Sequence, residues 1–365
     1  EKTQKTALFE QTPIPKAVMQ LCIPTILSSL VMVLYNLADT YFVGMLNDPV
    51  QNAAVTLAAP MLLAFNAVTN LFGVGSSSMM SRALGRKDYE MVKRSAAFGF
   101  YCTLFCGILF SLGYTILKQP ALAVLGATEL TEEATAGYLM WTVSCGTVPA
   151  MLNVVMAYMV RSEGEALHAS IGTMSGCLLN MILDPIFILP WGLDMGAAGA
   201  GCATFLSNCA ACMYFFVLLI VKRKRTFVCI NPKMFSFKKQ IVLGVCGVGI
   251  PSSIQNLLNV TGMTILNNFT AVYGADAVAA MGITQKVNMV PLYVAMGMSQ
   301  GIMPLISYTY ASGNYKRMKG GLKFALKVSL GFITTAAVLY FVGAGTITRM
   351  FMDNEAIVAY GTRFL

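Results

Sequence analysis

Residues 22–30, CIPTILSSL, and residues 249–257, GIPSSIQNL, share a proline, small polar residues and aliphatic residues in the same order. They lie about 227 residues apart, and a second pair keeps nearly the same offset. That pair is SRALGRKDYEMVKRS at 81–95 and YTYASGNYKRMKGG at 308–321. A constant offset over so long a block predicts two halves with the same topology.

The segments around these repeats are apolar. The chain has 365 residues, of which 56% are hydrophobic and 11% charged, and its mean hydropathy is +0.67. Soluble domains carry about 25% charged residues, so the composition indicates an all-α polytopic membrane protein. We expect spans at roughly 17–43, 53–80, 96–117, 134–160, 168–190, 196–221, 240–269, 278–309 and 324–348, with a tenth starting at 356.

Basic residues predict the orientation of these spans. They gather before the first span and in alternate connections, around 82–94, 161, 222–239 and 316–327, whereas the other connections carry acids. We therefore expect the N-terminus and the even-numbered connections to be cytoplasmic. The net charge of +9 and the KRKR at 222–225 could instead suggest nucleic acid, but their position beside spans argues against it.

The repeat and the basic connection define the expected domains. Residues 1–221 form an N-terminal lobe of six helices, 222–239 a cytoplasmic linker, and 240–365 a C-terminal lobe. Residues 231–239 of the linker, NPKMFSFKK, are predicted to form an interfacial helix. The repeat also predicts about 85 further residues after Leu365, because only part of the second half is present.

Two acids lie inside the spans, Asp39 in NLADTYFVG and Asp184 in LLNMILDPIFILPWG. A carboxylate at membrane depth is costly, so such groups face a bundle interior or a wet cavity. Asn180 and Asp184 are four residues apart and Asn36 and Asp39 three, which places each amide on its acid's helical face. Carboxylate and amide oxygens can bind Na⁺ or hold a protonated acid, and Pro185 bends the helix beside Asp184.

Longer stretches resemble the multidrug and toxic compound extrusion (MATE) family, in particular its DinF-like prokaryotic branch. They are IPTILSSLVMVLYNLADTYFVG at 23–44, ALGRKDYEMVKRS at 83–95, MVRSEGEALHASIGTMSGCLLNMILDPIFI at 159–188 and GAAGAGCATFLS at 196–207. The resemblance covers the whole chain.

The resemblance implies twelve helices in two pseudo-symmetric six-helix lobes around a V-shaped cavity, of which nine or ten are present here. It implies an antiporter that exports amphipathic or cationic compounds from the cell in exchange for H⁺ or Na⁺. Asp39, Asp184 and Asn180 match the family's N-lobe cation site, with Thr204 as a further member, and Na⁺ could be held by Asp39, Asn180 and Asp184. Span seven contains no acid, which favours coupling through the N-terminal lobe.

Further polar and methionine side chains are expected to line the substrate cavity: Asn153, Gln255, Asn256, Lys286 and Met289. The expected partners are small molecules and the lipid bilayer of the bacterial inner membrane, with no nucleic acid. The protein is expected to be a monomer. Ten scattered cysteines, with Cys209 and Cys212 inside an apolar span as the one C-x-x-C, and a single histidine do not indicate a bound metal or disulfide framework, so no cofactor besides the coupling ion is expected.

Two alternatives fit the same acids less well. A flippase for lipid-linked sugars of related fold would need a strongly basic cavity, but Lys286 and Arg363 are the only Lys or Arg residues within the spans apart from Lys327 at the start of the ninth. An intramembrane aspartyl protease would use paired carboxylates, but the chain lacks G-x-G-D. The sequence therefore predicts a transporter and not an enzyme.

Overall fold

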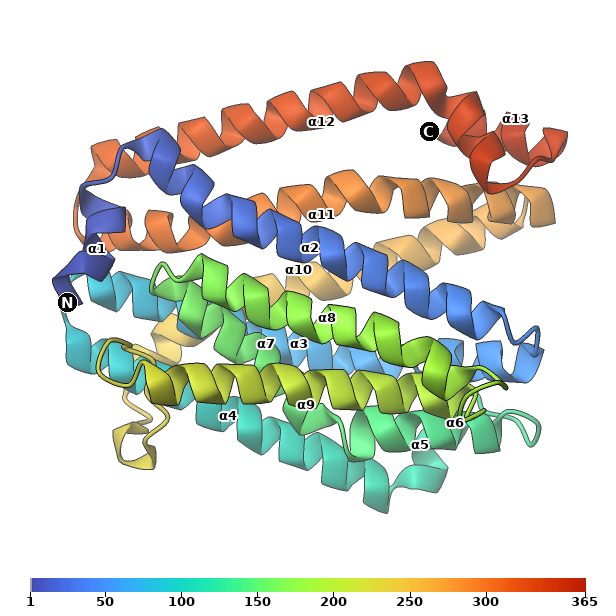
Figure 1. Cartoon of the computed structure of the whole chain (residues 1–365), viewed down its shortest axis with the longest axis horizontal. Coiled ribbons are helices and arrows are strands. Elements are labelled where there is room, and N and C mark those ends of the chain that lie inside the picture. The colour runs from blue at the N-terminus through green and yellow to red at the C-terminus, as the bar shows by residue number, and fades with distance from the viewer. Residues whose placement is uncertain (1) are drawn as a thin grey trace.

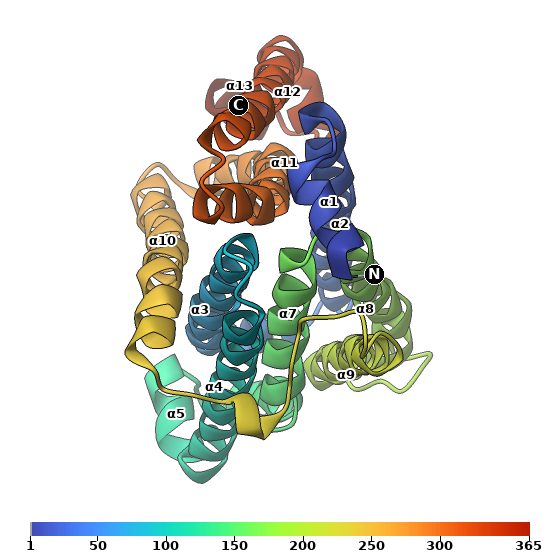
Figure 2. The same cartoon turned by 90° about the vertical axis from the view of Figure 1, so that its left-hand side faces the viewer.

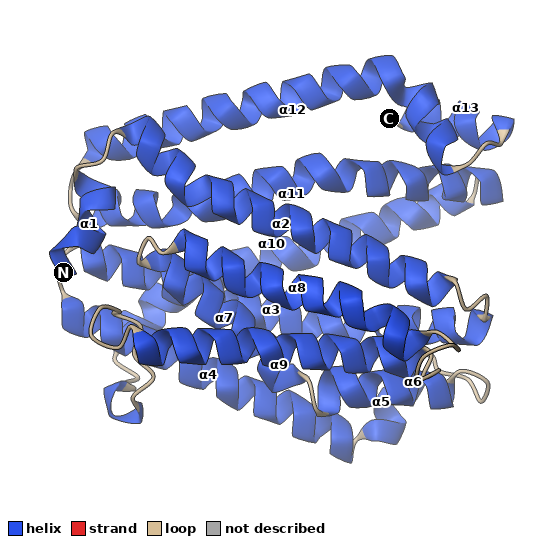
Figure 3. Ribbon diagram, in the orientation of Figure 1, coloured by secondary structure: helices blue, strands red, loops and turns tan. Residues whose placement is uncertain are grey.

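The structure is a computed structural model that describes residues 2–365, with side chains from Thr6 onward. Every regular element in that range is helical (Figure 3). The first half of the chain contains α1 (Lys2–Glu10), α2 (Ile14–Gly44), α3 (Pro49–Gly85), α4 (Tyr89–Ile116), α5 (Lys118–Leu125), α6 (Glu132–Leu139), α7 (Thr147–Ser162), α8 (Ala166–Ile188) and α9 (Ala197–Val221). The second half contains α10 (Lys239–Ala271), α11 (Ala275–Ala311), α12 (Tyr315–Phe351) and α13 (Glu355–Phe364).

The long helices run side by side along the long axis of the molecule (Figure 1). Within residues 2–365, eight of them are long and apolar enough to cross a membrane, or nine if a bent pair counts as one span. We call the end that carries the N-terminus and residues 86–88, 163–165, 222–238 and 312–314 the basic end. The opposite end, with residues 45–48, 117–131, 189–196, 272–274 and 352–354, is the acidic end.

The bent pair is the expected span at 134–160. Residues Glu132–Ser144 and Thr147–Ser162 meet at an angle of 45°, and a π-helical turn, Met140–Ser144, lies just before the break. Pro149 follows in the first turn of α7, where it has no N–H to continue the hydrogen-bond ladder. A π turn and a proline are both established causes of a helix kink, and here they act together.

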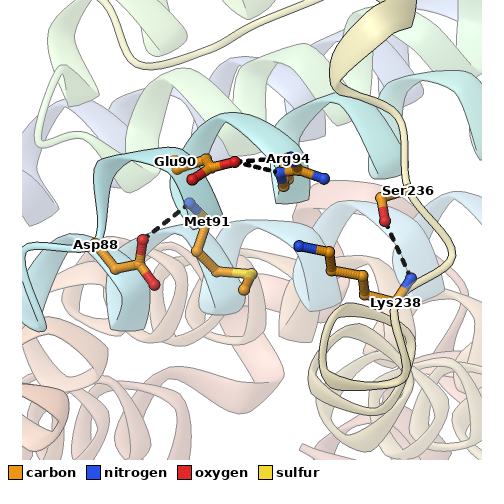
Figure 4. Close-up of polar contacts among 6 residues, drawn as sticks. All are labelled: Asp88, Glu90, Met91, Arg94, Ser236 and Lys238. Carbon is orange, nitrogen blue, oxygen red and sulfur yellow. Dashed lines mark hydrogen bonds and ion pairs between the residues drawn. The ribbon is translucent and has the colours of Figure 1, made fainter.

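Turn chemistry sets where several helices begin. Asp48 accepts a hydrogen bond from the Val50 backbone at 3.0 Å before α3, with Pro49 at the first helical position. Asp88 does the same for Met91 at 3.3 Å before α4, where Glu90 also binds Arg94 one turn later (Figure 4). Asp is among the preferred helix N-caps because its side chain satisfies a free backbone N–H.

The segment between α9 and α10 follows the first half of the chain. The carboxylate of Glu163 accepts hydrogen bonds from the Thr226 hydroxyl at 2.9 Å and from the backbone N–H groups of Phe227 and Val228. The ring of Phe227 stacks on Tyr89 with centroids 5.1 Å apart. This segment is therefore docked on the first half.

The predicted interfacial helix at 231–239 is wrong. Only Pro232–Met234 form a single 3₁₀ turn before α10 starts at Lys239. Phe235 and Phe237 contact the ring of Phe98 on α4, so the segment packs its aromatic rings on the bundle. Ser236 and Lys238 lie beside the first turns of α4, and Lys238 donates its backbone N–H to the Ser236 hydroxyl at 3.2 Å (Figure 4).

The two halves pack in a reciprocal way. The first long helix of the second half, α10, packs mainly on α3, and the second, α11, packs mainly on α2 (Figure 2). The sequence repeat pairs α2 with α10 and α3 with α11, so each contact is the counterpart of the other. This exchange is what an approximate two-fold axis along the membrane normal produces.

The apolar core shows where the halves join. At the basic end one buried cluster combines both halves, with Leu21, Met80 and Met159 from the first and Val245 and Leu305 from the second. At the acidic end the clusters are separate. One belongs to the first half, around Leu139 and Ile188, and the other to the second half, around Ala280 and Ile357. Among residues 6–365, the halves therefore share a buried cluster only at the basic end.

Candidate functional site

The candidate site lies inside the first half, towards the acidic end, where α2, α6, α8 and α9 meet. The C-terminal parts of α2 and α8 carry Asp39 and Asp184, and the two helices pack closely along their length. The side chain of Asp184 is 0% exposed and that of Asn180 is 3% exposed. Both residues lie on α8, one of the helices that the apolar spacing of the sequence predicted.

The two carboxyl groups lie within hydrogen-bonding reach of one another. The structure therefore brings together two acids that are 145 positions apart in the chain, Asp39 and Asp184. Two ionised carboxylates in contact repel one another, so one of them must be protonated or a cation must lie between them. The pair needs at least one proton or positive ion when it is buried.

Oxygen atoms at this site have no hydrogen-bond donor within the described part of the chain. They are one carboxyl oxygen of Asp39, both of Asp184 and the amide oxygen of Asn180. A buried oxygen without a partner costs about 1–3 kcal/mol, more when it is charged. Four such atoms in one place form a set that a proton or a hard cation such as Na⁺ can satisfy.

The amide of Asn180 points its donor away from the acids. Its Nδ2 donates to the Thr204 hydroxyl on α9 at 3.4 Å, and Thr204 donates to the carbonyl of Ala200 at 3.0 Å. This chain of contacts leaves the amide oxygen of Asn180 free of a donor. The structure thus brings Thr204 next to Asn180, as the sequence resemblance implied.

Two tyrosines also belong to the site and were missed by sequence reasoning. Tyr35 lies near Thr204 and within electrostatic reach of both acids, and Tyr138 on α6 faces the same pair. Tyr35 precedes Asp39 by four residues, so their shared helical face could have revealed it. Tyr138 carries no local signal, because it comes from another helix.

Asn36 is placed differently. Its side chain is half-buried, and within residues 6–365 no hydrogen bond joins it to either acid. The residue takes part only through its backbone carbonyl, which accepts from the hydroxyl of Thr40 at 3.0 Å. The structure therefore does not bring the Asn36 amide into the site.

The residues expected to line a substrate cavity lie apart from the acids. Asn153 is buried in α7 and donates to Pro149, Ala150 and the amide oxygen of Asn208 on α9 at 3.0–3.1 Å. Gln255 and Lys286 are exposed on α10 and α11, whereas Asn256 and Met289 on the same helices are half-buried. A recess of about 500 Å³ opens at the acidic end, between Lys118, Glu129, Glu133 and Met140, and contains none of them.

The MatE family model matches residues 24–186 and 251–365, which is most of the chain and includes both acids. The chain belongs to the MatE family. The match covers both halves of the repeat, as the two-lobe fold requires.

Curated relatives of this MatE chain carry the name multidrug export protein MepA. The Staphylococcus aureus (strain MRSA252) protein is 31% identical over 368 residues, covering 100% of this chain and 79% of the relative. The Staphylococcus saprophyticus protein is 30% identical over 366 residues with the same coverage. A solved structure described as the outward-facing conformation of a multidrug resistance MATE family transporter is 26% identical. It superposes with a TM-score of 0.92 over 100% of this chain and 80% of its own.

These matches confirm the predicted membership and fold class, an all-α membrane transporter with two lobes. They do not distinguish the DinF-like branch, which stays a prediction. The assignment of the site residues rests on the geometry described above.

Proposed function

We propose that this MatE chain exports amphipathic, cationic small molecules in exchange for H⁺ or Na⁺. Asp39 and Asp184 are its coupling site, with Asn180, Thr204, Tyr35 and Tyr138 around them. The observation that carries this proposal is the approach of the buried Asp184 carboxyl group to the half-buried carboxyl group of Asp39, with both oxygens of Asp184 and one of Asp39 lacking a hydrogen-bond donor among residues 6–365. Such a pair binds a proton or a cation because nothing else nearby compensates its charge.

Binding at this pair can change the preferred conformation. The acids come from α2 and α8, so a proton or Na⁺ that joins them favours the packing of these two helices. A ligand shifts a conformational equilibrium only through its different affinity for the two states. An ion site that is formed between two helices meets this condition, because its geometry depends on their distance.

The packing of the halves supports alternating access. A shared core at the basic end and separate cores at the acidic end describe a molecule closed on one side. We place the basic end in the cytoplasm of a bacterial cell, following the asymmetry of its basic loops. The conformation then faces outward, in agreement with the outward-facing MATE structure that it resembles.

The substrate class is taken from the relatives. The MepA proteins are named multidrug exporters, and they are matched along the entire length of this chain. Polar residues and methionines on α10 and α11, among them the exposed Gln255 and Lys286 and the half-buried Met289, are the proposed contacts for such compounds. Methionine side chains can repack around ligands of varied shape.

The test is efflux of a fluorescent cationic dye, ethidium, from proteoliposomes that contain the protein. Efflux is measured with a pH gradient alone, with a Na⁺ gradient alone and with neither. We expect one of the two gradients to drive efflux and its collapse to stop it. Efflux that is equally fast with neither gradient would exclude antiport, and no efflux under both gradients would exclude this substrate class.

A further inference from the structure

The short N-terminal helix α1 contacts both halves of the molecule at the basic end (Figure 2). Phe9, near its C-terminus, is fully buried, and its ring stacks on Tyr308 of α11 with centroids 4.8 Å apart. On the other side, a Cβ built on Gly164 would lie 3.1 Å from Leu8 and 3.3 Å from Phe9. Gly164 belongs to the turn between α7 and α8, so α1 lies between the first half and the second.

Polar contacts fasten the end of α1 to the second half. Arg317, in the first turn of α12, donates to the backbone carbonyls of Phe9 at 2.5 Å, Leu8 at 3.1 Å and Thr12 at 2.5 Å. Tyr308 donates its hydroxyl to the carboxylate of Glu10 at 2.5 Å. The last carbonyls of a helix have no partner within it, and a cation is favourable there. Arg317 thus caps α1 from the opposite half.

The same part of the molecule contains the seam between α2 and α11. Cys22 on α2 is fully buried, and its thiol lies 3.7 Å from the carbonyl of Met298 on α11. A Cβ built on Gly301 of α11 would lie 2.8 Å from the Cα of Cys22, so the two backbones are in close contact. Residues 11–13 join α1 directly to α2. The halves cannot separate at this end unless α1 leaves either Gly164 or Arg317.

We propose that α1 is a clasp that holds the basic end closed, with Arg317 and Tyr308 as the positioning residues that fasten it. The clasp is defined as residues 6–12 together with Tyr308 and Arg317. The contacts of the clasp must break before the basic end opens. Their strength therefore sets how often the basic end opens. This inference rests on the proposed export cycle, because only a transporter that opens on both sides needs such a contact.

The buried thiol of Cys22 gives a direct readout of opening. The other nine cysteines are replaced by serine, and Cys22 is alkylated with N-ethylmaleimide in membrane vesicles. The rates are compared for Arg317→Gln and for the control Lys316→Gln, which removes the same charge from the neighbouring, exposed position. We expect Arg317→Gln to raise the rate about tenfold, as the loss of a hydrogen bond to a charged group implies. The Lys316→Gln rate should equal that of the parent.

A second variant protects the test against a folding failure. Tyr308→Phe keeps the ring that stacks on Phe9 and removes the hydroxyl that donates to the Glu10 carboxylate, so we again expect a rise of about tenfold, as the loss of a hydrogen bond to a charged group implies. The melting temperature is measured for each variant. A rate that does not change in either variant, or a lower melting temperature without faster alkylation, would overturn the clasp and leave α1 as a structural anchor.

The outcome separates the clasp from the proposed function. Faster alkylation in Arg317→Gln together with no ethidium efflux by the parent would support the clasp and reject the export function. Unchanged alkylation together with gradient-driven efflux would reject the clasp and keep the function. Each measurement can therefore fail without the other.

Discussion

The carboxyl groups of Asp39 and Asp184 meet inside an apolar helix bundle, each at the end of a different helix. Around them the amide of Asn180 turns its donor to Thr204, and among residues 6–365 both oxygens of Asp184 and one of Asp39 have no hydrogen-bond donor. In water such a pair would simply ionise. Here the low dielectric makes its charge depend on whether a proton or cation is present.

Removal of one charge should therefore uncouple transport from its gradient. Asp184→Asn keeps the size of the side chain and provides its own donors, so the site no longer needs a proton or Na⁺. Coupling free energies of about 1–3 kcal/mol correspond to changes of about 5- to 150-fold. We expect gradient-driven ethidium efflux to fall about tenfold or more.

Asp276→Asn is the matched control for this variant. Asp276 is an exposed acid in the first turn of α11, at the same end of the molecule. The rate of ethidium efflux by the Asp276→Asn variant should stay within about twofold of the parent rate, the range expected for a surface substitution. Full gradient dependence in Asp184→Asn would show that the coupling site lies elsewhere.

The sequence alone located most of this architecture, for physical reasons. Apolar length predicted every long helix, because a span must satisfy its backbone within the membrane. The cost of a buried charge singled out Asp39 and Asp184. Their contact could not be read from spacing, since it depends on how α2 packs on α8. The family resemblance supplied it.

Other features depended on tertiary packing and were missed. Tyr138 approaches the acids from α6, and nothing near it in sequence points to them. The segment 231–239 has an amphipathic composition, yet it binds the bundle through Phe235 and Phe237 and is not helical. Asn36 has the right spacing from Asp39, but its amide does not join the site. Local patterns identify candidate groups, whereas their orientation is decided by neighbouring helices.

The tyrosine next to the acids should tune ion affinity. Tyr35→Phe removes the hydroxyl beside Thr204 and the acid pair and leaves the ring in place. If this hydroxyl forms a hydrogen bond in the ion-bound site, that bond is worth about 0.5–1.5 kcal/mol, so the apparent affinity for the coupling ion should fall about two- to tenfold. The measurement is ethidium efflux against the concentration of H⁺ or Na⁺ on the driving side.

Tyr41→Phe controls for loss of a tyrosine hydroxyl on the same helix. Tyr41 is 64% exposed near the acidic end of α2. Its variant should follow the parent's dependence on ion concentration. Equal shifts in both variants would mean that the change at Tyr35 does not act through the acid pair.

The seam between α3 and α10 predicts a strong preference for glycine at position 249. A Cβ built on Gly249 would lie 2.1 Å from the carbonyl oxygen of Leu71, an impossible contact without helix displacement. The nearby bond from Arg82 to the carbonyl of Gly244 at 2.8 Å holds the same two helices together. We expect Gly249→Ala to cost about 1–3 kcal/mol, as overpacking does, and to lower the melting temperature in detergent.

Gly247→Ala tests whether the effect comes from the contact. Gly247 lies two residues earlier in α10, and a Cβ there meets nothing within 4 Å. Alanine favours a helix over glycine by about 1 kcal/mol, so this variant should be as stable as the parent or slightly more so. Similar melting temperatures for the two alanine variants would contradict the close approach of α3 and α10.

The docking of the connecting segment on the first half depends on Glu163. Its carboxylate accepts hydrogen bonds from Thr226, Phe227 and Val228, and such bonds from backbone N–H groups to a charge are among the stronger ones. Glu163→Gln keeps the shape but loses the charge and places a donor where only acceptors fit. We expect the segment to undock more often and trypsin to cut at 222–225 about tenfold faster, since each bond to a charged group contributes about 1.5–3 kcal/mol.

Glu90→Gln is the control, because Glu90 is exposed and its partner Arg94 lies on its own helix. Cleavage at 222–225 that is no faster in Glu163→Gln than in Glu90→Gln would mean that the aromatic contacts of Phe227, Phe235 and Phe237 hold the segment without the carboxylate.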